Sequence, residues 1–177
     1  MHAKQRKIFA INAIGGIAVL GSYAWGICLH PNNSGQVWGG VPEWLKPTYT
    51  ASMLLAAAGY FPLFYFINFR VDPERVRVGG YGFDLFGRLY VAILLPSALW
   101  MPMTFAMLAE PRPWLWLAIR LVLFTVGAAS LATLAALLLL QPRQPGWPFR
   151  LAVLGCAAFC VQTALLDALV WPAYFPR

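Results

Sequence analysis

The sequence predicts an all-α membrane protein, a bundle of five transmembrane helices in one membrane domain over residues 1–177. Of these residues, 60% are hydrophobic and 11% are charged, whereas soluble domains carry about 25% charged residues. A helix of about 20 apolar residues crosses a bilayer. Five stretches satisfy this requirement, and they cover residues 8–29, 49–69, 89–109, 114–140 and 150–170.

The loops between these stretches predict the orientation of the chain. Nine basic residues fall on the side of the N-terminus and three on the other side. Since short cytoplasmic loops are rich in Lys and Arg, we expect the N-terminus inside and the C-terminus outside. The net charge of +7 is then a topology determinant, and nucleic acid is not an expected partner. The nine residues are Lys4, Arg6, Lys7, Arg70, Arg75, Arg77, Arg88, Arg143 and Arg150, and the three are Lys46, Arg112 and Arg177.

Residues 8–29 are expected to form the first helix. The stretch is too long for a typical signal-peptide core and lacks an A-x-A cleavage site. Its four glycines favour close helix packing. With no transit peptide and a clear excess of basic residues inside, we expect a bacterial inner membrane protein. Residues 30–48 form the longest outer loop, in which Gly, Pro and Asn argue against long regular structure.

Residues 49–69 form the second predicted helix. A run of small residues ending at Gly59 predicts a smooth packing surface, and Pro62 predicts a kink. Residues 70–88 follow as the longest inner loop, with four arginines offset by three acidic residues. This loop is interpreted either as a solvated cytosolic segment or as a surface for lipid headgroups or a partner.

The last three helices are predicted from longer apolar runs. Residues 89–109 contain Pro96 and Pro102, which predict a kinked helix whose backbone opens toward a cavity. Residues 114–140 hold a single charge and have small residues at their centre. Residues 150–170 follow a short proline-rich loop and form the last helix.

The three cysteines do not indicate a disulfide or a metal site. Cys28 lies near the end of the first helix, and Cys156 and Cys160 lie in the last one. Thiols in such positions are expected to be small apolar residues. No histidine falls within a predicted helix, so no haem ligand is present there, and the sequence leaves any cofactor unknown.

Arg120 and Asp167 are the ionisable residues well inside the predicted helices. At 1.5 Å per residue, Arg120 lies about 9 Å below the outer end of its helix and Asp167 about 7.5 Å below the end of the next. Burial of a charge in hydrocarbon costs about 2.5–3.5 kcal/mol on insertion scales. We therefore expect an ion pair or a shared polar network between them. Alternatively, Arg120 extends its long side chain to the outer headgroups.

The tryptophans are distributed unevenly. Six of the eight fall at or above the predicted outer interface, whereas an aromatic belt would mark both interfaces. This asymmetry predicts an outward-facing aromatic pocket with residues 30–48 as its lid, or else interfacial anchors that bind nothing. The residues expected to contact a hydrophobic or amphipathic small molecule are Arg120, Asp167, Gln162, Trp38, Trp44, Trp100 and Trp116.

Two short segments carry a family resemblance. The segment W-L-K-P at 44–47, in the loop after the first helix, and L-W-M-P at 99–102 in the third resemble the tryptophan-rich sensory (TspO-type) family. This resemblance implies a five-helix fold that binds porphyrins and sterol-like ligands in a cavity capped by that loop. The chain departs from the family at 48–51, which reads T-Y-T-A in place of W-x-P-P, and at 166–168, which reads L-D-A where A-L-N is expected.

Three functions follow from these patterns. The first is binding, sensing or transport of a small hydrophobic or amphipathic molecule at the outer pocket. The second is a non-catalytic subunit or assembly factor of a membrane complex, with the small-residue faces contacting partner subunits or further copies of the chain. The third is a lipid-modifying enzyme that uses Asp167 as acid or base. The third is the least favoured, because no Ser/His/Asp set, Walker loop or H-E-x-x-H motif is present. Membrane lipids are expected partners in each case.

Overall fold

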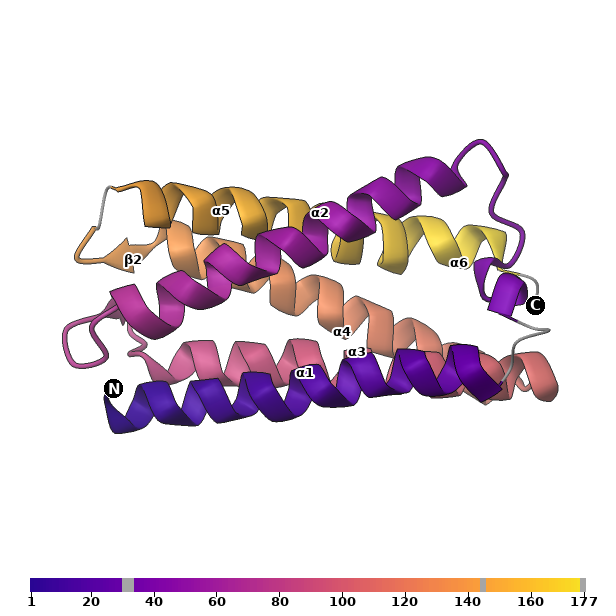
Figure 1. The fold of residues 1–177 in the computed structure, drawn as a ribbon, viewed down its shortest axis with the longest axis horizontal. Coiled ribbons are helices and arrows are strands. Elements are labelled where there is room, and N and C mark those ends of the chain that lie inside the picture. Colours follow the sequence, from indigo (N-terminus) through magenta and orange to yellow (C-terminus); the bar gives the residue numbers. More distant parts are fainter. Residues whose placement is uncertain (30–33, 144–145, 176–177) are drawn as a thin grey trace.

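The computed structural model describes residues 1–29, 34–143 and 146–175. It is an elongated helical bundle with its two termini at opposite ends (Figure 1). In the described residues, five helices are long and apolar enough to cross a membrane, which confirms the all-α class. These helices are α1 (Ala3–Leu29), α2 (Lys46–Tyr65) with η2 (Phe66–Arg70), α3 (Asp84–Ala109), α4 (Pro113–Leu138), and α5 (Trp147–Cys160) with η3 (Val161–Val170) and α6 (Trp171–Tyr174).

Each predicted span overlaps one of these helices, but the ends differ. Helices α1 and α3 each begin five residues earlier than predicted, because the basic first turns of α1 and Asp84 at the start of α3 extend beyond the apolar stretch. Helix α4 ends at Leu138, two residues short of the prediction. The chain turns there into β2 (Leu140–Gln141), which pairs antiparallel with β1 (Arg77–Val78).

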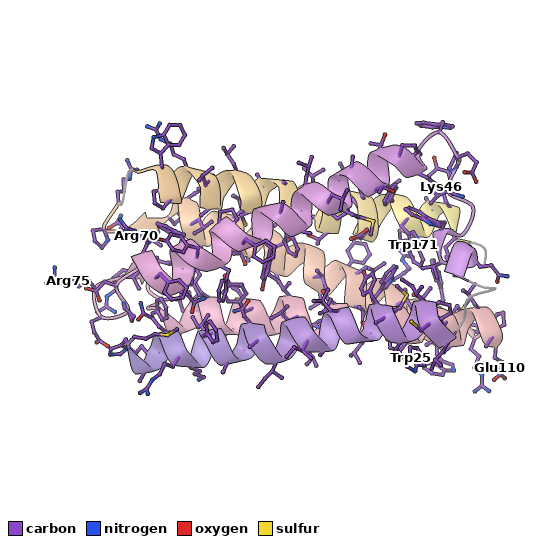
Figure 2. The ribbon with its side chains drawn as sticks, in the orientation of Figure 1. Trp25, Lys46, Arg70, Arg75, Glu110 and Trp171 are labelled. Carbon is purple, nitrogen blue, oxygen red and sulfur yellow. The ribbon has the colours of Figure 1, made fainter. Side chains whose placement is uncertain are left out.

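The loop from α2 to α3 caps one end of the bundle, which we call the basic end. It contains β1, and its side chains Val71, Val76, Val78 and Phe83 are buried. They belong to the same apolar core cluster as Leu137 at the end of α4. The interpretation of residues 70–88 as a simple solvated loop is therefore wrong for its apolar side chains. Its arginines remain exposed, as Arg70 and Arg75 show in Figure 2.

Two of the main helix pairs join segments that are not consecutive in the sequence, whereas α4 packs on its neighbours in sequence. Helix α1 packs against α3, α2 packs against α5, and α4 contacts α3, α5 and η3. Helix α3 runs continuously through both of its prolines. In α2, Pro62 precedes by four residues the change to π-type hydrogen bonding at η2. This is the π-helical adjustment by which a membrane helix accommodates proline.

Glycines lie at the closest of these contacts. A Cβ atom on Gly59 of α2 would lie 2.6 Å from the Cα of Gly155 in α5, so the two backbones touch. Gly15 and Gly26 of α1 meet side chains of α3, and Gly127 of α4 meets Ala164 of η3. These four glycines of the predicted small-residue faces on the first, second and fourth helices thus serve packing within the bundle, whereas a Cβ on Gly16 or Gly21 of α1 would meet nothing within 4 Å in the described structure.

Replacing Gly155 with alanine is expected to destabilise the bundle by about 1–3 kcal/mol, the usual cost of overpacking. The added Cβ would collide with the backbone carbonyl of Gly59, which cannot rotate away. The effect is measured by unfolding each protein in mild detergent, with heat or with increasing denaturant. The matched control is Gly21→Ala in α1, where an added Cβ meets nothing within 4 Å in the described structure. Equal stability of the two variants would contradict the backbone contact.

Candidate functional site

Aromatic rings from three helices and the C-terminal segment meet at the end of the bundle opposite the basic end. The ring of Trp171 lies 5.7 Å from that of Trp100, 6.1 Å from Trp116 and 4.6 Å from Phe175, between ring centroids. Trp171 is only 4% exposed. We call these four residues the tryptophan cluster, and the end of the bundle that carries them the tryptophan end (Figure 2). The cluster joins α3, α4 and α6.

The loop after α1 is held against this cluster. The indole nitrogen of Trp171 donates to the carbonyl oxygen of Val37 at 3.0 Å. The backbone N–H of Gly40 donates to the carbonyl oxygen of Tyr174 at 2.7 Å. Residues 34–45 therefore lie where the lid was predicted, whereas residues 30–33 of that lid lie outside the described residues.

Asp167 finds its hydrogen-bond partner on its own helix. The side-chain nitrogen of Gln162 donates to the Asp167 carboxylate at 2.7 Å. Both residues lie on η3, in which hydrogen bonds are of the π type. A π-helix bonds residue i to i+5, and such segments are frequent at functional sites. The spacing of five thus places the amide and the carboxylate together.

The predicted ion pair between Arg120 and Asp167 is not formed. Among the described residues no nitrogen of Arg120 lies within 4.0 Å of a carboxylate oxygen. The depths do match, because each residue lies four positions from the contact between Trp116 and Trp171. The Arg120 guanidinium instead lies 5.8 Å from the centroid of the Phe124 ring.

Two tyrosines from the first two helices complete the surroundings of Asp167. Tyr23 of α1 and Tyr49 of α2 lie within electrostatic range of its carboxylate. The Tyr23 ring packs 5.7 Å from Trp100, and the Tyr49 hydroxyl donates to the carbonyl oxygen of Leu166 at 2.7 Å. Neither these tyrosines nor Trp171 are among the residues that the sequence predicts for the site. Trp171 could have been predicted there, because it lies one helical turn from Asp167 in the sequence.

Three buried polar atoms in this region have no hydrogen-bond partner among the described residues. They are Nε1 of Trp100, Nε of Arg120 and Oε1 of Gln162. A buried polar atom left unsatisfied costs about 1–3 kcal/mol. Two of the atoms are donors and one is an acceptor, so the donors need a bound acceptor and the Gln162 oxygen needs a bound donor. Two further unpartnered atoms, Tyr90 Oη and Asn68 Oδ1, lie away from the tryptophan cluster.

The other two tryptophans predicted for the site have different positions. Trp38 packs edge-on against Tyr49, with 5.9 Å between ring centroids, and belongs to the loop of residues 34–45. Trp44 is 75% exposed. It does not join the tryptophan cluster, because the turn that carries it points its side chain away from the bundle.

The donor groups of the described residues do not form a metal site. No three His, Cys, Asp or Glu side chains come close enough together there to hold an ion. Cys156 and Cys160 are buried free thiols, and the Cys156 thiol contacts the carbonyl oxygen of Ser130 at 3.9 Å.

No family model, curated protein or solved structure matches this chain. The resemblance to the TspO-type family therefore rests on the two short segments that contain Trp44 and Trp100.

Replacing Gln162 with leucine is expected to lower the free energy of unfolding by about 1–3 kcal/mol, because it leaves the Asp167 carboxylate without its donor. Replacing both residues with leucine removes donor and acceptor together, and that change is expected to be nearly neutral. Unfolding of both variants in detergent measures the two changes in the free energy of unfolding. A double variant no more stable than Gln162→Leu alone would show that the hydrogen bond does not couple the two side chains.

Proposed function

We propose that this protein binds a small amphipathic molecule at the tryptophan end. The apolar part of the molecule would lie against the tryptophan cluster, beneath residues 34–45. Its polar part would bind near Gln162 and Asp167. The observation that carries this proposal is the group of buried polar atoms without partners, on Trp100, Arg120 and Gln162.

The polarity of these atoms indicates the chemical class of the molecule. The indole of Trp100 and the Nε of Arg120 donate hydrogen bonds, so the molecule should carry a carbonyl, carboxylate or ether oxygen. The free oxygen of Gln162 accepts one, so a hydroxyl or N–H group should lie nearby. Ligand sites of this kind are mostly apolar with a few placed polar groups.

The proposed orientation puts the tryptophan end outside. The basic end carries nine Lys and Arg residues, and cytoplasmic loops are enriched in these residues. The site would then open toward the outer surface of a bacterial inner membrane. The identity of the bound molecule, which native mass spectrometry would reveal, decides whether it is sensed or transported.

A subunit or assembly role is the second candidate, and one observation favours it. Gly16 and Gly21 of α1 meet no described atom within 4 Å, and α1 exposes Ile14, Ile17 and Leu20 beside them. Small residues on a lipid-facing helix are those at which another helix packs closely. A partner helix would then lie along α1.

Native mass spectrometry of the protein extracted in mild detergent is expected to show a reproducible small-molecule adduct. Trp100→Phe and Gln162→Leu should each weaken the affinity for the adduct about ten-fold, since a hydrogen bond in a desolvated site contributes about 1.4 kcal/mol. Trp44→Phe is the matched control and should retain the adduct, because Trp44 lies outside the cluster.

Two outcomes would contradict the binding proposal. One is wild-type protein without any adduct after gentle extraction. The other is an adduct that all three variants retain equally. Foreign chains in fixed stoichiometry, lost on Gly21→Leu, would instead support the subunit role.

A further inference from the structure

A shallow groove opens on the flank of the bundle at the basic end. Its volume is about 320 Å³. It lies between the turn that follows β1, the start of α3 and the last turns of α4. Its lining includes Tyr81, Leu85, Leu89, Ala132, Ala135 and Leu139.

The groove is apolar and faces outward. Ala132 and Ala135 of α4 and Leu139, which follows α4, are all exposed, so the groove faces whatever surrounds the bundle. In a bundle that spans a membrane, these surroundings are lipid chains near the level of the headgroups. Tyr81, which is 60% exposed at the rim, is a residue type enriched at this level.

Two arginines lie next to residues of the groove lining in the sequence. Arg77 on β1 precedes Val78 of the lining, and Arg88 on α3 lies between Leu85 and Leu89. Both are exposed, and neither makes an ion pair or a side-chain hydrogen bond within the part of the chain that the structure describes.

Two of the three nearby acidic side chains form ion pairs with basic residues other than Arg77 and Arg88. Asp72 pairs with Arg75 at 3.5 Å, and Glu74 pairs with Lys4 at 3.4 Å. Asp84, one turn before Arg88, is the third acidic residue at this end, against nine basic ones. The rim of the groove therefore keeps an excess of positive charge.

We propose that the groove binds one anionic phospholipid of the surrounding bilayer. An acyl chain would lie on the apolar floor formed by α3 and α4, and Arg77 and Arg88 would bind the phosphate and its anionic headgroup. Guanidinium groups form strong, bidentate hydrogen bonds with phosphate, and basic pockets at helix ends bind anionic headgroups. A free anion would gain nothing from the apolar floor, so the combination favours a lipid.

The test is native mass spectrometry of the purified protein titrated with phosphatidylglycerol or with phosphatidylcholine of identical acyl chains. The wild-type protein is expected to retain more phosphatidylglycerol than phosphatidylcholine. Each of Arg77→Gln and Arg88→Gln should reduce that preference about five-fold, the effect of one basic residue near a membrane surface. Arg75→Gln is the matched control, because Arg75 belongs to the same cap but is paired with Asp72.

A second pair of variants tests the apolar part of the groove. Ala135→Trp fills the floor and should reduce retention of both lipids. Ala128→Trp places the same bulk at an exposed position of α4 outside the lining and should leave retention unchanged. Thermal unfolding of each variant establishes that it is folded before lipids are added.

Three results would overturn the proposal. Equal retention of the two lipids by the wild-type protein would exclude recognition of the anionic headgroup. An equal loss of preference in Arg75→Gln would indicate diffuse attraction by the whole basic end. Unchanged retention in Ala135→Trp would show that the lipid lies elsewhere.

Discussion

At Gly59 and Gly155 the backbones of α2 and α5 touch, and the long pairing of these two segments depends on that contact. The pairing is antiparallel and keeps one register along its length. Toward the tryptophan end, the Tyr49 hydroxyl bonds to the carbonyl oxygen of Leu166. Toward the basic end, the ring of Phe66 lies 5.6 Å from that of Phe149. In lipid no hydrophobic force draws helices together, so close packing has to stabilise the pair.

Much of the architecture could be predicted from the sequence, because lipid imposes simple demands on composition. Helix number and approximate helix ends follow from apolar length, and the packing role of Gly59 follows from its lack of a side chain. The equal depth of Arg120 and Asp167 also follows from counting residues. Their separation could not be predicted, since depth along a helix says nothing about which neighbour a side chain faces.

The hydrogen bond between Gln162 and Asp167 was beyond sequence reasoning for a different reason. In an α-helix, residues five apart point about 140° away from each other. They meet here because η3 is a π-helix, and no residue in that segment predicts the change from α-type to π-type hydrogen bonding. The buried cap over the basic end was missed in a similar way. Its arginines predict exposure to solvent, whereas each of its buried valines directly follows an arginine and faces the core.

The helix pairing also bears on how the bundle assembles during synthesis. Chains are made from the N-terminus onward, yet α1 packs mainly on α3 and α2 mainly on α5. In a bilayer, the second helix would therefore lack its main partner, and Gly59 would face lipid, until the last helix is inserted. The same last segment carries Asp167 and Trp171, so the pairing of α2 and the completion of the tryptophan cluster would both depend on its insertion.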